Sequence, residues 1–451
     1  MLILIGFASF GGDLGNASGI PCIILQAGEW QISPVKANYP NNIASLMSGI
    51  SGLVWMPLVN CWGRMPVLFW STVLGMSFHL GAILAPDFNT YYALRVISAL
   101  NVSVGQTIGL TFVKDCFFFH EHARKIGIWI TMFACAPFLC PMLGNFIIGT
   151  IGEWRPVFWM VFGWYCFLLC LLVMFGDETY YNRTVSVDQQ PVRRAGQYQR
   201  LLRVLGAWQL KHHSGYFTTV ISAYWRLLHI FIKPVILLMM IFYSVVFMWF
   251  LGIAISSSIL LETPTSLGGY GLGPIGVGCV FITPIVGLLI GEGIGHWLND
   301  YLVYLYGKRH QGLYVPEIRL YTAYISIALI VPGLILIGQT LHHHLPVVAL
   351  VFGWGMNTVG ILMLSVAVLS YALDCYPSAS GEVSALINMG RVALGFSVGY
   401  FQQEWGQKQG FDVSFGLQAA VIVAAYVICG FVHKYGARMR TFAGPVHPLK
   451  Y

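Results

Sequence analysis

Charged side chains are scarce in this sequence. Asp, Glu, Lys and Arg together make up 9% of its 451 residues, whereas ordinary globular proteins carry roughly a quarter. A water-soluble surface cannot be covered with so few charges, so this scarcity excludes an ordinary soluble protein. Apolar residues instead make up 57% of the chain.

Patterns typical of metal or redox chemistry are also missing. None of the ten cysteines stands in a spacing that would form a zinc site, and nearly all lie inside apolar blocks or at their ends, where disulfides are not favoured. We interpret the run His342, His343, His344 as an incidental feature of a loop. No grouping of acid, base, metal ligand and nucleophile indicates an enzyme, and nothing indicates a cofactor.

Long apolar blocks with almost no charge run through the chain. A bilayer core about 30 Å thick needs a helix of about 20 such residues, and the blocks lack the two-residue alternation of a barrel wall. We therefore predict an all-α membrane protein with twelve transmembrane helices. The predicted spans are Leu4–Leu25, Ile43–Val59, Val67–Leu84, Tyr91–Val113, Ile126–Thr150, Val157–Phe175, Val235–Leu260, Leu272–Ile290, Tyr321–Gln339, Pro346–Tyr371, Val383–Phe401 and Phe415–Val432.

The first block differs from a secretory signal peptide. No basic region precedes it, and Asp13 interrupts it where a signal core is purely apolar. We therefore count it as a span. Because the block begins at Met1 without a polar segment before it, the sequence is consistent with one that lacks a short N-terminal tail.

Basic residues fall mostly on one side of the predicted membrane. With the N-terminus inside, 19 of the 24 Lys and Arg residues lie in cytoplasmic loops or the tail, as the positive-inside rule requires. We therefore predict that both termini are cytoplasmic, and that the net charge of +7 meets anionic membrane lipids rather than nucleic acid. The cytoplasmic set is Arg64, Lys114, Arg124, Lys125, Arg183, Arg193, Arg194, Arg200, Arg203, Lys211, Arg226, Lys233, Lys308, Arg309, Arg319, Lys434, Arg438, Arg440 and Lys450.

One long polar stretch divides the blocks into two groups of six. We predict an N-terminal six-helix bundle over 1–176, a cytoplasmic central loop over 177–233, a C-terminal six-helix bundle over 234–433 and a cytoplasmic tail over 434–451. Within the central loop, apolar residues at helical spacing stand beside basic ones. This pattern predicts helices that lie on the inner membrane surface.

Ionisable residues inside the spans are candidate functional residues, because a mid-span charge costs at least ~2.5 kcal/mol on insertion scales. Asp13 lies near the middle of the first span, and Ser9 and Asn16 share its helical face. A carboxylate there can take up and release a proton as its access to water alternates. The alternative is a hydrogen-bonded structural Asp. We favour proton coupling for Asp13 and place Asn16 in a substrate cavity.

Arg95 begins a face of small and polar residues in the fourth span, and Gln106 lies further along it. Such a face suits either a cavity wall or close helix contact, and Gln106 is a candidate for the cavity. Arg95 is a candidate counter-ion for Asp13, although it lies nearer the outer surface. Glu292, at the end of the eighth span, and Arg391, in the eleventh, suit either structural ion pairs or roles in proton coupling and gating.

Aromatic and polar faces occur in the seventh and tenth spans. Tyr243 stands on such a face in the seventh span, and Trp354, Asn357 and Thr358 stand on or beside one in the tenth. Aromatic faces usually serve packing. Here they would give a cavity an apolar wall with a few hydrogen-bonding groups, as ligand pockets generally have.

Short motifs stand at the predicted membrane faces. PLVNCWGRMPVLFW follows the second span, DCFFFHEHARKIGIW the fourth, ACAPFLCPMLGN lies in the fifth, GEWRPVFW and DETYY flank the sixth, VPEIRL precedes the ninth, and YALDCYPSASGEVSALINMGR leads into the eleventh. In this order they resemble the major facilitator superfamily and, within it, the fungal twelve-span drug:proton antiporter group. The likeness covers nearly the whole chain.

The resemblance implies roles for particular residues. The loop after the second span resembles the family's gating signature, but Asn60 and Cys61 replace its usual Asp and basic residue. Arg95 matches a buried arginine that the family associates with proton coupling. Glu292 is also assigned to coupling, from its buried charge in the eighth span and not from the resemblance. The residues assigned to conformational gating are Gly63, Arg64, Pro137, Pro141, Gly144, Asp374, Glu382 and Arg391.

The resemblance also implies a mechanism, in which two six-helix bundles rock about a central site lined chiefly by the first, fourth, seventh and tenth spans. We predict a monomeric secondary active transporter of a small amphiphilic molecule in the plasma membrane. Proton-coupled efflux of a drug, toxin or secondary metabolite is the preferred function. The alternatives are a proton-coupled uptake symporter for a nutrient and a non-transporting sensor, which the altered signature loop would suit.

Overall fold

The computed structural model describes the chain except residues 118–121, 183–184, 187, 189, 194–195, 214–215, 265–268, 312–313 and 447–451. The described residues form helices and no strand. This is expected of an apolar chain, because in lipid each segment must satisfy its own backbone hydrogen bonds. Of the basic residues predicted to be cytoplasmic, Arg183, Arg194 and Lys450 lie outside the described residues.

The helices form an N-terminal half, a C-terminal half and a connecting segment. The N-terminal half contains α1 (Leu2–Ala17), α2 (Ile23–Glu29), α3 (Pro34–Ala37), α4 (Tyr39–Trp62), α5 (Arg64–Ile83), α6 (Phe88–Val102), α7 (Val104–Cys116), α8 (His122–Ile151) and α9 (Arg155–Phe175). The connecting segment contains α10 (Gln197–Leu205), α11 (Ala207–Lys211) and α12 (Val220–Phe231). The C-terminal half contains α13 (Pro234–Glu262), α14 (Pro274–Val280), α15 (Ile282–Arg309), η4 (Pro316–Arg319), α16 (Leu320–His343), α17 (Val347–Cys375), η5 (Pro377–Ala379), α18 (Ser380–Ala393), α19 (Gly395–Gln409) and α20 (Phe411–Ala443).

These helices provide the twelve predicted spans. Among the described residues, ten helical segments are long and apolar enough to cross a membrane. The shorter α1 supplies the first span, and α18 followed by α19 supplies the eleventh. The architecture is therefore an all-helical membrane fold of two six-span halves, as predicted.

Three spans differ most from their predicted extent. The first, predicted as Leu4–Leu25, is interrupted: α1 ends at Ala17, turns follow, and α2 begins at Ile23. Pro21 lies in these turns and has no N–H to continue a helix. The eighth span continues to Arg309, because charge and glycine after Ile290 end the apolar run without ending the helix. The twelfth continues as α20 to Ala443, so the segment predicted as a tail begins as helix.

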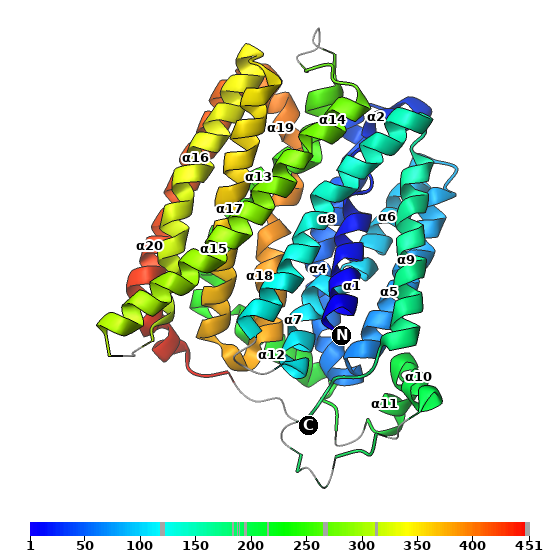
Figure 1. The fold of residues 1–451 in the computed structure, drawn as a ribbon, viewed down its shortest axis with the longest axis vertical. Coiled ribbons are helices and arrows are strands. Elements are labelled where there is room, and N and C mark those ends of the chain that lie inside the picture. The colour runs from blue at the N-terminus through cyan, green and yellow to red at the C-terminus, as the bar shows by residue number, and fades with distance from the viewer. Residues whose placement is uncertain are drawn as a thin grey trace.

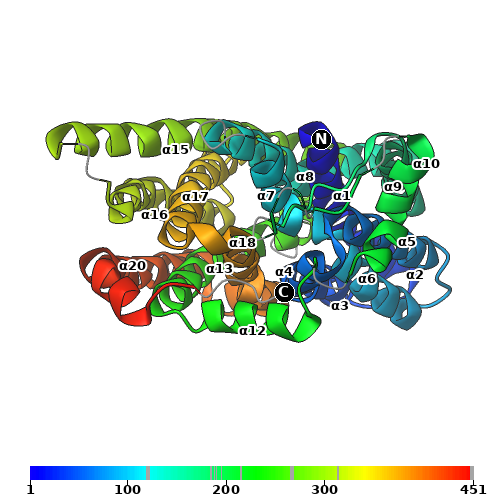
Figure 2. The same cartoon turned by 90° about the horizontal axis from the view of Figure 1, so that it is seen from below.

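The two halves stand side by side (Figure 1). α10, α11 and α12 lie at the end of the molecule that is at the bottom of Figure 1. We call this the lower end and the opposite one the upper end. Seen from below, α12 lies along one edge of the molecule (Figure 2), where it contacts α4 of the N-terminal half and α18 of the C-terminal half.

Candidate substrate cavity and gating contacts

A cavity of about 150 Å³ lies between the two halves. Its walls come from α1, α4, α7 and α8 on one side and from α13, α15, α17 and α18 on the other. Movement of one half against the other would therefore change the cavity directly. The polar residues of its lining, apart from the aromatic ones, are Asp13, Asn16, Asn41, Ser45, Ser48, Gln106, Glu292, Ser365, Ser384, Asn388 and Arg391.

Asp13 faces this cavity from α1. Its side chain is 7% exposed, and one of its carboxylate oxygens has no hydrogen-bond partner among the described residues. Asn16 and Gln106 lie beside the carboxylate, and the charge of Arg391 acts on it. The structure thus brings together four residues that the sequence places in three different spans. A buried carboxylate on a cavity wall can exchange a proton with water that enters the cavity.

The polar face predicted for the first span divides between two environments. Asn16 lines the cavity, and its amide donates a hydrogen bond to Ser103 Oγ at 2.9 Å. Ser9 is fully buried and instead accepts a hydrogen bond from the Trp129 indole at 2.7 Å. Ser9 therefore fastens α8 to α1 and takes no part in the cavity wall.

Arg95 contacts the end of α1 rather than the Asp13 carboxylate. Its guanidinium donates to the carbonyl oxygens of Gly15 at 2.7 Å and Asn16 at 3.0 Å. It also donates to Ser18 Oγ at 3.2 Å. The last turn of a helix leaves carbonyl groups without partners, and the interruption of the first span places such a turn inside the protein. Arg95 therefore stabilises the helix end that carries Asp13.

The small residues of the fourth span bring two backbones into contact. A Cβ atom at Gly105 would lie 2.7 Å from the carbonyl carbon of Ala8, and one at Gly12 would lie 2.6 Å from the Val102 oxygen. Only glycine fits at these crossings. Gln106 nevertheless lines the cavity beside them, so the face serves both of the purposes considered for it.

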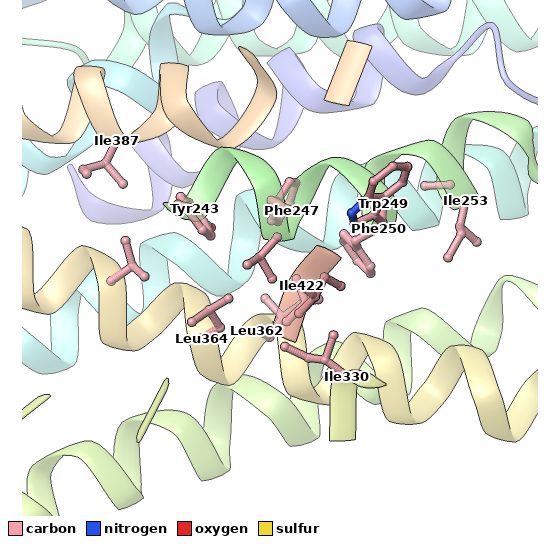
Figure 3. Packing of buried hydrophobic residues seen from close by; sticks show 14 of the residues in the cluster. Tyr243, Phe247, Trp249, Phe250, Ile253, Ile330, Leu362, Leu364, Ile387 and Ile422 are labelled. Atoms are coloured by element: carbon pink, nitrogen blue, oxygen red, sulfur yellow. The ribbon is translucent and has the colours of Figure 1, made fainter. Parts of the chain in front are cut away.

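Aromatic side chains form the apolar part of the wall. Figure 3 shows Tyr243, Phe247 and Phe250 following one another along α13, opposite Leu362 of α17. The Tyr243 hydroxyl donates to Ser365 Oγ at 2.7 Å. The N-terminal half contributes aromatic residues from α8, which lies outside the four spans expected to form the wall. Their signal in the sequence is aromatic spacing at intervals of four and five, at Trp129, Phe133 and Phe138.

Three residues of α17 predicted to line the cavity do not line it. Trp354 packs edge-on against Phe281, with ring centroids 5.4 Å apart, and the Thr358 hydroxyl donates to the Trp354 carbonyl at 2.8 Å. Asn357 is fully buried outside the cavity. Ser365, on the predicted face but further along α17, does line it. Helical spacing groups residues by face, but it carries no information on the depth at which the cavity lies.

Glu292 lies deeper than the predicted end of the eighth span implies. Because α15 continues to Arg309, Glu292 is near the middle of the helical segment and its side chain lies in the cavity wall, 3% exposed. The carboxylate lies 3.1 Å from the Nε2 atom of His296, one turn away. His296 approaches α8 at Gly127. Glu292 is therefore a second acidic group within reach of cavity water.

The signature loop at the lower end keeps its arginine contacts. Gly63 has a φ of +88°, which favours glycine. Arg64 Nε lies 2.5 Å from Asp115 Oδ2 near the end of α7, and its guanidinium lies 4.9 Å from the Tyr180 ring. Glu178 accepts the Arg64 backbone N–H at 3.1 Å and so caps the start of α5. These contacts join α5, α7 and the segment after α9.

A matching ion pair stands at the lower end of the C-terminal half. Arg319, just before α16, pairs with Asp374 near the end of α17, and Tyr314 donates to the same carboxylate. Arg64 and Asp115 likewise stand at the start of the third span and near the end of the fourth. The two pairs therefore occupy corresponding positions in the two halves, as expected of repeated bundles. We call them the two braces.

Glu382 joins the halves at the lower end. It lies in the first turn of α18 and accepts a hydrogen bond from Asn60 of α4 at 3.4 Å. Its carboxylate also lies 3.2 Å from the guanidinium of Arg226 on α12. On the other side of α12, the Tyr224 hydroxyl donates to the Val54 carbonyl of α4 at 2.8 Å. α12 thus ties the two halves together, a role that its basic and aromatic residues do not reveal in the sequence.

The motif of the fifth span lies on α8, which continues through both of its prolines, Pro137 and Pro141. A Cβ atom at Gly144 would lie 2.6 Å from Pro21, so α8 packs closely against the turn that interrupts the first span. Asn145, the next residue along, is buried and donates to the Pro141 carbonyl at 2.8 Å. Its side chain is therefore accommodated within the helix.

Known proteins resemble this chain in sequence and in fold. Quinidine resistance protein 3 of Saccharomyces cerevisiae is 27% identical over 161 residues, which cover 36% of this chain and 23% of that protein. The citrinin biosynthesis cluster MFS transporter of Monascus ruber is 21% identical over 424 residues, covering 92% and 81% of the two chains. Among solved structures, the proton:xylose symporter XylE superposes with a TM-score of 0.65 at 14% identity, over 96% of this chain and 95% of that one.

The family follows from the match over most of the chain. The sequence profile of the Major Facilitator Superfamily matches residues 2–400. The twelve spans, the two halves and the cavity between them agree with that match. This chain belongs to the Major Facilitator Superfamily and is a membrane transporter rather than an enzyme.

Proposed function

We propose that this transporter exports a small amphiphilic molecule in exchange for protons, by alternating access of the cavity between its halves. The observation that carries the proposal is the buried Asp13 carboxylate on the wall of a largely aromatic cavity. A relative named for quinidine resistance and another from a citrinin biosynthesis cluster support export of a drug, toxin or secondary metabolite.

The cavity lining suits such a cargo. Aromatic rings from α8 and α13 offer apolar surface, while Asn16, Gln106 and Tyr243 offer a few hydrogen-bonding groups, a combination typical of ligand pockets. Asp13 and Glu292 would each bind a proton when the cavity opens to one side and release it when the cavity opens to the other. Binding of a proton and binding of cargo in one cavity would then couple the two movements.

The gating contacts support movement of the halves as units. Each brace holds the lower end of its own half together, so relative motion is confined to the seam between the halves, where Glu382 meets α4 and α12. The Arg64 brace is intact despite the altered signature loop, which favours a working transporter over a sensor. We place the lower end, with both termini, at the cytoplasm, in a monomer of the plasma membrane.

Flux into proteoliposomes tests the proposal. Purified transporter is given radiolabelled quinidine, citrinin or xylose under an imposed pH gradient, with protein-free vesicles correcting for passive trapping of weak bases and acids. An antiporter accumulates its cargo when the lumen is acidic, in either orientation, because protons leave as cargo enters. Accumulation only with an alkaline lumen indicates a symporter, and binding without flux indicates a sensor.

Asp13→Asn tests the coupling residue. We expect this variant to equilibrate cargo down its gradient while losing pH-driven accumulation, because an amide cannot carry the proton. Asp87→Asn is the matched control: Asp87 caps α6 in an exposed loop, and Asn caps a helix nearly as well. Accumulation by Asp13→Asn at the level of this control would refute the assignment.

A further inference from the structure

Arg391 belongs to the C-terminal half, but its contacts reach into the N-terminal half. It lies in the last turn of α18 and is the one basic side chain among the described residues that line the cavity. Its Nη2 atom donates to Gln106 Oε1 of α7 at 3.3 Å. The guanidinium lies 5.6 Å from the Phe133 ring of α8 and 5.5 Å from the Phe247 ring of α13. A cation held over two rings in this way is attracted to both.

Gln106 connects Arg391 to Asp13. Its side-chain oxygen accepts from Arg391, and its amide nitrogen, which makes no hydrogen bond among the described residues, lies beside the Asp13 carboxylate. Polar groups of α1, α7 and α18 therefore stand next to one another in the cavity wall. The other ionisable groups around Asp13 are Arg95 of α6, which binds the α1 carbonyls, Tyr165 of α9, Tyr243 of α13 and Glu292 of α15.

We infer that Gln106 and Arg391 form a bridge between the halves whose strength depends on the charge of Asp13. While Asp13 is ionised, its negative charge holds Arg391, and with it α18, against the N-terminal half. When Asp13 is protonated this attraction is lost, and only Gln106 and the two rings retain the guanidinium. The inference rests on the proposed function of Asp13 and adds the link from proton uptake to movement.

The position of Arg391 lets α18 respond to this change. The eleventh span is interrupted at Leu394, directly after the last turn of α18. α18 packs tightly on α4: a Cβ atom at Gly381 would lie 2.3 Å from Met56 Cε, and one at Gly49 would lie 2.4 Å from Val392. α18 is therefore the helix that closes the seam toward the lower end. When Arg391 is released, α18 loses one of the contacts that hold it against the N-terminal half.

Hydrogen–deuterium exchange of the full chain in lipid nanodiscs tests the bridge without any cargo. The readout is backbone exchange over residues 380–393 at one pH near neutral, so that intrinsic exchange rates stay constant. We expect Asp13→Asn and Arg391→Gln each to raise the backbone exchange rate of residues 380–393 by about tenfold, the factor in an equilibrium constant that corresponds to a change of one in a pKa. Because Gln106 and the two rings still hold Arg391 in Asp13→Asn, the double variant should exchange no faster than Arg391→Gln alone, and Arg391→Lys should restore most of the protection.

Arg155→Gln is the matched control. Arg155 pairs with Glu29 in an exposed position at the upper end, 2.7 Å apart, and its loss should leave exchange over 380–393 at the wild-type level. If Arg391→Gln does not yield a monodisperse protein, Gln106→Leu breaks the same bridge while keeping the charge of Arg391. It is expected to raise exchange in the same segment.

Additive effects in the double variant would show that Asp13 and Arg391 act independently and would overturn the bridge. Wild-type exchange in Arg391→Gln, or in Gln106→Leu where that variant is used, would overturn it as well. The proposed function fails by a different result, namely coupled transport by Asp13→Asn in proteoliposomes. Uncoupled Asp13→Asn combined with wild-type exchange in Arg391→Gln would therefore reject the bridge alone.

Discussion

Removal of the Arg226 guanidinium should open the seam at the lower end. Arg226 and Glu382 are only 12% and 7% exposed in their ion pair, and Arg226 also donates to the Ser378 carbonyl at 2.8 Å. In Arg226→Gln, the Glu382 carboxylate would keep Asn60, at 3.4 Å, as its partner. The variant therefore leaves a nearly buried charge with one neutral hydrogen bond.

The size of the effect follows from this burial. Removing one partner of a fully buried ion pair costs ~3–5 kcal/mol, whereas an exposed pair contributes ~0–1 kcal/mol. Arg226 and Glu382 lie between these limits, at the edge of the protein where water and the new amide compensate in part. We expect a cost of ~1–3 kcal/mol, which changes the ratio of open to closed seam by about 5–150-fold.

A cysteine at Met56 reports on the seam. Met56 is 1% exposed and packs against Gly381 of α18, so Met56→Cys reacts with a water-soluble maleimide only when α4 and α18 part. Labelling is quantified on the peptide that carries position 56, because the chain has ten native cysteines. We expect Arg226→Gln to raise the labelling rate of the cysteine at position 56 by about 5–150-fold.

Arg203→Gln provides the control for this experiment. Arg203, which is as buried as Arg226, forms an ion pair with the more exposed Asp177 at 2.6 Å, but this pair docks α10 on the N-terminal half and does not cross the seam. Equal labelling rates in Arg226→Gln and its parent would refute the role of α12 as a tie. A rise of the same size in both variants would refute it too, since the effect would then be general destabilisation.

Three further predictions concern the lower end. Arg64→Gln, which loses its brace, should lower the turnover of the transported probe about tenfold while leaving its affinity within about twofold; a normal rate with poorer affinity would contradict this. Gly63→Ala should cost ~1–3 kcal/mol, measured by thermal unfolding, because alanine is strained at positive φ and its Cβ would lie 2.3 Å from Glu178 Oε2. Burial disfavours the charged form of Asp177, but hydrogen bonds, first among them that from Arg203, outweigh burial and hold the pKa of Asp177 below its usual value. This stabilisation is present above pH ~4 and is lost as the pH falls through the lowered pKa, so the gap in thermal stability between the wild type and Asp177→Asn should close on acidification.

Hydropathy predicts the number and type of the spans because lipid imposes the same requirement on every crossing helix. It predicts their ends poorly where polarity changes without a change in backbone structure. Glu292 shows the consequence: the apolar run stops beside it while α15 continues to Arg309, so a residue predicted for a helix end lies in the cavity wall. The depth of a residue depends on the full helix and its neighbours, which the apolar run alone does not contain.

The partners of a buried charged side chain are harder to predict from the sequence than the helix on which it lies. The sequence offers Arg95 as a counter-ion for Asp13, yet the interruption of the first span supplies carbonyl groups that bind Arg95 instead. Arg391, from the eleventh span, becomes the basic residue of the cavity. Which side chains contact one another depends on how helices distant in the sequence pack. Helical spacing and composition do not predict that packing.

The location of the first brace in the chain bears on biosynthesis. Arg64, Asp115 and the capping residue Glu178 all precede α10, so every group this brace requires is synthesised before α13. Folding of multidomain chains generally begins with the N-terminal part during translation. The first bundle can therefore lock its own lower end in the membrane while its partner is still being made, and a translation product truncated before residue 234 retains every member of that lock.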